Sequence, residues 1–175
     1  MLRNVTTIFP MQTNDFAQDP TPPDCFRLEE LQAFQSFEQQ SLVDVNYYLW
    51  LNHTSAAETP ARFLYVLELI FDQPEALILS SGEDSDAIGI ISPEALIKTA
   101  GRLRTLHGRV SVQRVNAGVL PLWQQVIGRT LDGIRLSRKE NSLYLNDVLL
   151  LDFGSRKIVV QLSMKDGLEV GEYIP

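Results

Sequence analysis

The sequence predicts an α+β protein built from two related helix-plus-antiparallel-β units, bridged by a central helix. Three observations predict this class. Similar apolar spacing occurs twice along the chain, alternating apolar segments follow each helix-like stretch, and short connections between those segments suit hairpins. A parallel sheet would instead need repeated strand–crossover–strand patterns, which the sequence lacks.

The repetition is carried by two groups of residues that align without gaps. In the first group, one constant offset relates Phe34, Phe37, Val45 and Tyr47 to Trp123, Val126, Ile134 and Leu136. In the second, another offset relates Phe71, Leu77, Ile78, Asp84 and Ile88 to Phe153, Val159, Val160, Asp166 and Val170. We interpret this as an internal duplication. The alternative is that any two β-hairpin units share such spacing.

The predicted organisation has four segments that together form one compact domain. They are an N-terminal strand and extended arm (1–25), a first α+β unit (26–92), a bridging helix and strand (93–115) and a second α+β unit (116–175). The length of 175 residues suits one domain or two closely packed halves.

For the first part of the chain, the sequence predicts a short strand and an arm, then a helix followed by strands. We expect a strand at 3–9, an arm at 10–24, a helix at 28–40 and strands at 43–49, 63–71, 76–79 and 87–91. Along the helix, apolar residues recur every third position from Leu28 to Phe37. Alternation in the first long strand predicts that Val43, Val45, Tyr47 and Leu49 face inward. The nearly continuous apolar run at 63–71 predicts a strand covered on both faces.

The second part begins with a strong helix start, Ser92-Pro93-Glu94, which predicts a helix to about Leu106. Leu96, Ala100, Leu103 and Leu106 are expected to face inward. We then expect a strand at 110–115, a short helix at 121–127 and strands at 131–137, 143–153, 157–162 and 168–174. The Asp166-Gly167 step suits the positive backbone angles of the last hairpin turn.

Composition indicates a cytoplasmic protein that does not enter a membrane. The longest apolar runs, such as 148–151, are far too short to cross a bilayer. The N-terminus lacks the basic start and apolar core of a signal peptide. Cys25 is the only cysteine, which excludes an internal disulfide and a thiolate metal cluster.

Charge is distributed unevenly. Residues 1–97 hold three arginines against fifteen acids, whereas residues 98–175 hold twelve Lys/Arg against seven acids. One interpretation is that the two halves attract each other. The sharper one is that the acidic half faces a basic protein partner. A loose basic stripe (Lys98, Arg102, Arg104, Arg109, Arg114) has no interleaved aromatics, so we do not expect nucleic-acid binding.

The candidate partner-binding residues are two aromatics and three acids. Tyr48 and Trp50 share the outward parity of the first long strand, as interface anchors would. The alternative is that a loop or the N-terminal arm covers them. Glu83, Asp84 and Asp86 form the densest carboxylate group. They lack the full spacing of a calcium-binding loop, so no metal is predicted.

No residues are predicted to be catalytic, and no cofactor is expected. The chain has no phosphate-binding glycine loop, no nucleophile elbow and no HExxH sequence. Asp147 and Asp152 have opposite parity on one strand, so we expect them on opposite faces. His53 and Cys25 are more readily explained as a solvated histidine and a buried thiol.

These observations favour a non-enzymatic protein-interaction module with an acidic N-terminal half, one version being an inhibitor- or immunity-like protein. The alternative is a small-ligand-binding protein that uses a cleft between the two repeated units. A third hypothesis is an enzyme with a site assembled from scattered residues such as His53 and Asp147. It requires that those side chains converge in one pocket.

Overall fold

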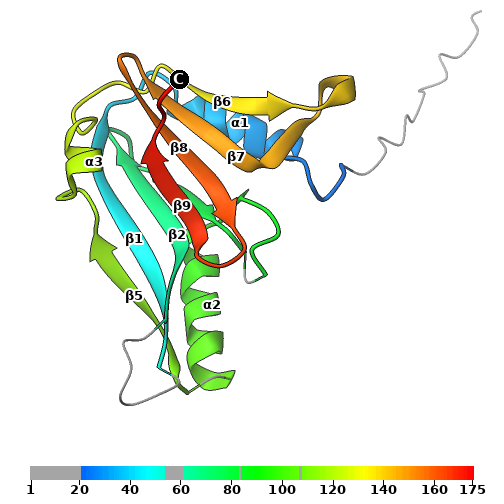
Figure 1. The fold of residues 1–175 in the computed structure, drawn as a ribbon, viewed down its shortest axis with the longest axis vertical. Coiled ribbons are helices and arrows are strands. Elements are labelled where there is room, and N and C mark those ends of the chain that lie inside the picture. The colour runs from blue at the N-terminus through cyan, green and yellow to red at the C-terminus, as the bar shows by residue number, and fades with distance from the viewer. Residues whose placement is uncertain (1–20, 54–60, 83, 107) are drawn as a thin grey trace, which may run out of the picture.

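The computed structural model describes residues 21–53, 61–82, 84–106 and 108–175 (Figure 1). The strand predicted at 3–9, most of the arm at 10–24 and Glu83 lie outside the described residues. The elements, in chain order, are α1 (Leu28–Phe37), β1 (Leu42–Asn52), β2 (Ala61–Phe71), β3 (Leu77–Ser80), β4 (Gly89–Ile90), α2 (Pro93–Leu106), β5 (Val110–Asn116), α3 (Pro121–Gln124), β6 (Gly133–Arg138), the 3-10 turn η1 (Glu140–Ser142), β7 (Tyr144–Phe153), β8 (Arg156–Ser163) and β9 (Gly167–Glu172).

The predicted fold class is wrong. Of the described residues, 46% are in strands and 21% in helices, and the strands belong to one sheet rather than to two α+β units. Seven of them follow the order β4-β3-β2-β9-β8-β7-β6 in a curled half-barrel, and β1 and β5 extend it beside β2. The matched apolar spacing does not mark two duplicated units, because any antiparallel meander alternates in this way. The two helices that it aligned also differ, with ten residues in α1 and four in α3.

Each half of the sheet is a run of neighbouring antiparallel strands. Among the named strands of the described residues, the first half (β1–β5) pairs with the second half (β6–β9) between β2 and β9, where Leu64 pairs with Gly167 in parallel. Gly167 has a φ of +81°, and a Cβ there would lie 2.4 Å from the Leu64 carbonyl oxygen. The glycine is therefore required twice, by its backbone angle and by the close approach that fuses the halves.

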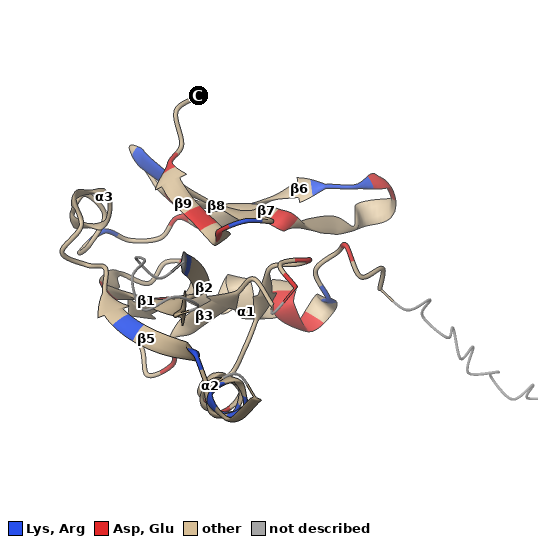
Figure 2. Cartoon of the chain, turned by 60° about the horizontal axis from the view of Figure 1, so that its bottom comes forward, with Lys and Arg blue, Asp and Glu red and all other residues tan. Residues whose placement is uncertain are grey.

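The main core lies between the two halves. Figure 2 shows them as two layers facing each other, with α1 at the open side. Phe34 and Phe37 of α1 point into this space, and the Phe37 ring lies 5.5 Å from that of Phe71. The fully buried Trp123 of α3 donates a hydrogen bond from Nε1 to the Tyr47 hydroxyl, at 2.7 Å. Both halves therefore contribute to a single core, as the continuous sheet requires.

A second, smaller apolar cluster lies on the outer face of the first half, where α2 packs. It comprises Tyr65, Val66, Ile78 and Leu96, with Tyr48, Trp50, Phe63, Ala76 and Ile91 packed against them. The pairing of β1 with β2 shifts between Tyr48 and Leu49, which leaves Tyr65 as an extra residue. This bulge lets Tyr65 and Val66 both face α2. The helix predicted to bridge two units instead covers one face of the first half.

Most elements lie close to their predicted positions, but individual side chains differ. Val43 was expected inside and is 52% exposed, because the register shifts between Leu42 and Asp44 and buries Leu42 instead. Leu28 and Leu106, at the ends of their helices, are also exposed rather than inward. None of the helices in the described ranges is long and apolar enough to span a membrane.

Candidate functional site

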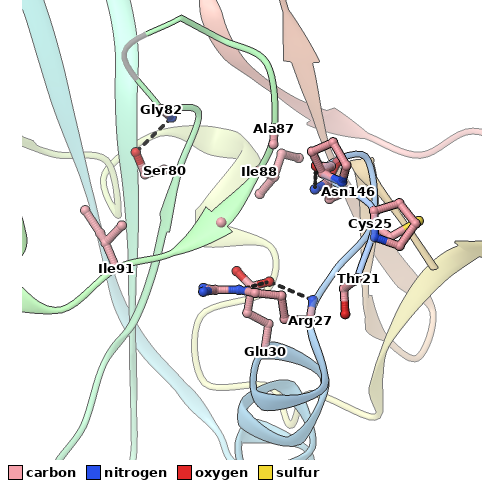
Figure 3. A pocket seen from close by; sticks show the side chains of 13 residues that line it. Thr21, Cys25, Arg27, Glu30, Ser80, Gly82, Ala87, Ile88, Ile91 and Asn146 are labelled. Atoms are coloured by element: carbon pink, nitrogen blue, oxygen red, sulfur yellow. Dashed lines mark hydrogen bonds and ion pairs between the residues drawn. The ribbon is translucent and has the colours of Figure 1, made fainter. Parts of the chain in front are cut away.

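A pocket of about 280 Å³ opens at the mouth of the curled sheet, between the β3–β4 edge and β7 (Figure 3). We call it the mouth pocket. Its walls come from the segment before α1, the start of α1, the β3–β4 region and β7. The residues that line it are Thr21, Pro22, Pro23, Cys25, Arg27, Glu30, Ser80, Gly82, Ala87, Ile88, Gly89, Ile91 and Asn146.

Glu30 ties the start of α1 to the edge of the first half. Its side chain is buried, and Oε1 accepts a hydrogen bond from the Ile90 backbone at 3.2 Å. Oε2 accepts one from the Arg27 backbone at 2.9 Å and lies 3.4 Å from Arg27 Nε. A buried carboxylate needs such partners, because burying it without them costs on the order of several kcal/mol of stability. Glu30 is thus a structural acid in the pocket wall.

Asn146 holds the opposite wall through three hydrogen bonds. Its backbone oxygen accepts from the Ile88 amide at 2.7 Å, and its own amide donates to the Asp24 oxygen at 3.1 Å. Its side chain donates from Nδ2 to the Pro23 oxygen at 2.9 Å. One residue of β7 therefore joins the second half to both the β4 side and the segment before α1. This contact fixes the width of the mouth.

Cys25 is buried in the wall and is not set up as a nucleophile. Burial raises the pKa of its thiol, and the neighbouring Asp24 carboxylate raises it further. A hydrogen bond from Lys139 lowers the pKa of Asp24, with 2.7 Å between Nζ and Oδ2. Since attack requires the thiolate, this raised pKa makes the thiol less reactive.

Two of the predicted acids stand on the loop between β3 and β4, which we call the lip, but neither is among the residues that line the mouth pocket. Asp84 and Asp86 are both exposed on the loop between β3 and β4, next to the lining residues Gly82 and Ala87. Figure 2 shows further acidic residues on α1 and on nearby loops. Glu83, the third predicted acid, lies outside the described residues. The acidic half thus presents carboxylates on a loop that contributes to the mouth pocket.

The predicted aromatics are placed elsewhere. Tyr48 and Trp50 lie on the outer face of β1, and Trp50 meets Phe63 and Tyr65 edge-to-face with ring centroids 5.6 and 6.0 Å away. Within the described chain, no contact joins either aromatic to Asp84 or Asp86. Tyr48 lines a separate groove of about 210 Å³ between α2 and the sheet. The structure therefore separates the predicted site residues into two surfaces.

The remaining candidates do not assemble a reaction centre. His53 is exposed at the end of β1 and Asp147 is exposed on β7, and neither lines the mouth pocket or the groove. Asp152 is buried, with Arg135 Nε at 2.8 Å and Lys157 Nζ at 2.5 Å. Burial raises its pKa, but the hydrogen bonds from Lys157 and Arg135 outweigh burial and hold that pKa below its usual value. In the described ranges, no cluster of His, Cys, Asp and Glu side chains is arranged to hold a metal ion.

Sequence reasoning missed the polar residues that shape both hollows, namely Glu30, Asn146, Glu68 and Arg114. A usable signal was present for two of them. Glu68 interrupts the apolar run of β2, and Asn146 interrupts the run of leucines and valine in β7. A polar residue in a strand buried on both faces needs partners that the sequence does not name.

Comparisons with protein-family models, curated proteins and solved structures find no match for this chain. The function must therefore be argued from the site itself.

Proposed function

We propose that this chain is a non-enzymatic interaction module that binds a basic protein partner at the lip of the mouth pocket. The observation that carries the proposal is the placement of Asp84 and Asp86. Both side chains are exposed, and both stand on a loop that borders a pocket between the two halves of the sheet. Paired acids on an accessible lip attract a basic partner and disfavour acidic ones.

The pocket behind the lip suits a single inserted side chain. Its volume of about 280 Å³ lies just under the roughly 300–1,000 Å³ of pockets for drug-sized ligands. Arg27 is the one cation among its lining residues, and it is paired with Glu30. The Arg27 side chain is 65% exposed, so attraction for an incoming lysine or arginine rests on the lip carboxylates Asp84 and Asp86.

The chemistry of the walls favours binding over catalysis. No histidine is among the lining residues, and the pKa of the Cys25 thiol is raised rather than lowered. An activated nucleophile needs an adjacent base or a depressed pKa. The carboxylate that the Cys25 thiol contacts, Asp24 at 3.6 Å, raises the pKa of the thiol instead of lowering it.

The test is affinity capture from the cell that produces the protein, at low and at high salt, with two matched charge-reversal variants. The first is Asp84→Lys with Asp86→Lys. The control is Asp72→Lys with Glu75→Lys, which makes the same charge change in the same half at the other end of β3. We expect a basic protein that is lost at high salt and with the first variant but kept with the control.

Loss with both variants would mean that the overall charge matters and the mouth does not. Retention with the first variant would overturn the proposal. Tyr48→Ala and Trp50→Ala, tested in the same experiment, ask whether the predicted aromatic anchors contribute. Their distance from the lip in the fold predicts that partner binding survives both changes, provided that the variants fold.

A second candidate function is small-ligand binding in the mouth pocket, which the pocket's position between the β3–β4 edge and β7 favours. The ligand would carry a compact cation, since acids stand at the lip. Agmatine, a free guanidinium compound, is a direct probe. A rise in melting temperature with agmatine, lost on Asp84→Lys with Asp86→Lys, would favour this function, because ligands that bind the native state stabilise it.

A further inference from the structure

The groove between α2 and the outer face of the first half has one polar end. Its floor consists of Tyr48, Glu68, Ile78, Val112 and Arg114, which lie on four neighbouring strands. Asn46 Nδ2 lies 2.9 Å from Glu68 Oε2, the Tyr48 hydroxyl 3.3 Å and Arg114 Nη2 3.5 Å. A carboxylate and a guanidinium therefore stand side by side at the end of an otherwise apolar groove.

Only one oxygen of the Glu68 carboxylate has hydrogen-bond partners in the described part of the chain. All three of those donors meet a single oxygen, Oε2, and no hydrogen bond within the described part of the chain reaches Oε1. The Glu68 side chain is 15% exposed, and Oε1 is not among the buried atoms of the described residues that lack a partner, so this oxygen is open to a ligand or to water. Burial and the Glu68 charge both raise the pKa of the Tyr48 phenol, so its hydroxyl stays protonated at neutral pH. A carboxylate oxygen in this position favours a cationic donor.

The guanidinium is available to a second charge. Arg114 lies on the edge strand β5 with 56% of its side chain exposed, and its 3.5 Å contact to Glu68 is long for an ion pair. Only the Arg114 side of the pair is exposed, and at this distance we expect its contribution to be close to the roughly 0–1 kcal/mol of surface pairs. A ligand whose anionic group binds Arg114 and whose cationic group binds Glu68 would therefore break a contact of low energy. In exchange it would form two charge-assisted hydrogen bonds.

The rest of the groove is apolar and small. Ile78, Pro93, Leu96, Ile97, Ala100 and Val112 complete its lining. Its volume of about 210 Å³ is below the roughly 300–1,000 Å³ of pockets for drug-sized ligands. Ile97 of α2 is 72% exposed at the wall, which leaves a large apolar side chain ready to be covered by an occupant.

We propose that this groove binds a free apolar α-amino acid. The ammonium group binds Glu68 Oε1, the carboxylate binds the Arg114 guanidinium, and the side chain fills the space between Ile78, Leu96 and Val112. The site has no net charge but offers both signs next to an apolar recess, which matches a zwitterion with an apolar side chain. This site is distinct from the mouth pocket and does not depend on the function proposed there.

The test compares leucine with two analogues that each lack one charge. N-acetyl-leucine has no ammonium group, and leucinamide has no carboxylate. Isothermal titration of the full chain should show that leucine, or another of valine, isoleucine, methionine and phenylalanine, binds. Each single-charge analogue of the amino acid that binds should bind at least about tenfold more weakly, because a hydrogen bond to a charged group contributes about 1.5–3 kcal/mol.

Two variants locate the binding. Glu68→Gln should weaken binding of the amino acid at least about tenfold on the same ground. The control is Gln113→Ala, the neighbour of Arg114 on β5, whose side chain has the opposite parity and so points away from the groove. The control should bind as the native chain does. If Glu68→Gln does not fold, the analogue series with the native chain still decides.

Two results would overturn the proposal. One is the absence of binding by all five amino acids up to about 10 mM, ten times the dissociation constant of a weak millimolar complex. The other is that N-acetyl-leucine or leucinamide binds as tightly as leucine. This would show that the site does not recognise the ammonium and the carboxylate together.

Discussion

The two halves of the sheet treat their outer faces differently. In the first half, Val66 and Ile78 point outward and are fully buried, because α2 lies over them. In the second half, the corresponding face carries Arg135, Lys157 and the buried Asp152 in an ion-paired group, with no described helix above it. One continuous sheet thus has an outer face covered by a helix in the first half and, in the second half, an outer face where an ion-paired group lies beside partly buried apolar side chains. The cover, not the strand pairing, decides which residues the strand can carry.

The junction of the halves offers the largest effect. Gly167→Ala would place a Cβ 2.4 Å from a backbone oxygen of β2 at a residue with positive φ. We expect a loss of about 4 kcal/mol in the free energy of unfolding, because backbone strain adds to a clash that only strand separation relieves. Urea unfolding measures it. The matched control is Gly171→Ala on the same strand, where a Cβ meets nothing within 4 Å.

A change of about 1 kcal/mol or less at Gly167 would mean that the halves are not fused there. Two meanders that merely pack against each other would tolerate a small shift at this point. The comparison with Gly171 separates the geometry of the junction from the general effect of replacing glycine in a strand.

The covered and uncovered faces are compared directly by the same substitution in each. Val66→Ala removes two buried methyl groups beneath α2, where the side chain is fully buried. We expect a loss of about 2.5 kcal/mol from transfer and cavity terms. Val159→Ala, on the outer face of β8, lies at a half-buried position with no described helix above it and should cost about 1 kcal/mol or less. Equal losses would show that α2 adds no burial.

The ion-paired group of the second half predicts a pH dependence. The pKa of Asp152 is lowered in the folded chain, so its contribution is present above the unfolded pKa and is lost as pH falls through the folded value. Asp152→Asn should cost about 2 kcal/mol at neutral pH, and the difference from the native chain should shrink in acid. Urea unfolding across a pH series measures this.

Asp147→Asn is the control for that series, since Asp147 is an exposed carboxylate on the same strand. The free energy of unfolding of Asp147→Asn should differ from that of the native chain by the same amount at every pH. A constant difference for Asp152→Asn would instead show that the carboxylate is not stabilised by Arg135 and Lys157.

The sequence predicted where elements lie far better than how they assemble. Apolar alternation locates β7 and β8 because it reflects burial along one strand, which is a local property. It could not reveal that Gly167 approaches Leu64, since a close backbone contact leaves no pattern beyond the glycine itself. It also misplaced Val43, because a bulge changes the parity of a strand without changing its composition.

The candidate site was predicted only in part for a similar reason. Asp84 and Asp86 could be proposed because acids in a turn are conspicuous; the structure shows that both are exposed, and their role in binding stays a prediction. Glu68 and Asn146 depend on contacts with residues tens of positions away, such as Arg114 and Pro23. Tyr48 and Trp50 were expected on the outer face of their strand, and they do lie there. A composition pattern could not show that α2 packs on that face.

The smallest expected effect concerns the stability of α2, the helix that covers the outer face of the first half. Ser92 Oγ accepts a hydrogen bond from the Ala95 amide at 3.1 Å, as expected of a residue that caps a helix. Ser92→Ala should cost about 1 kcal/mol. Hydrogen exchange should speed up within α2 and not within α1, because loss of the cap favours local opening. Ser36→Ala, an exposed serine within α1, is the control and should change stability little, since alanine favours helix. Uniform acceleration in both helices would mean that α2 opens only when the whole sheet unfolds, so that cover and sheet form one cooperative unit.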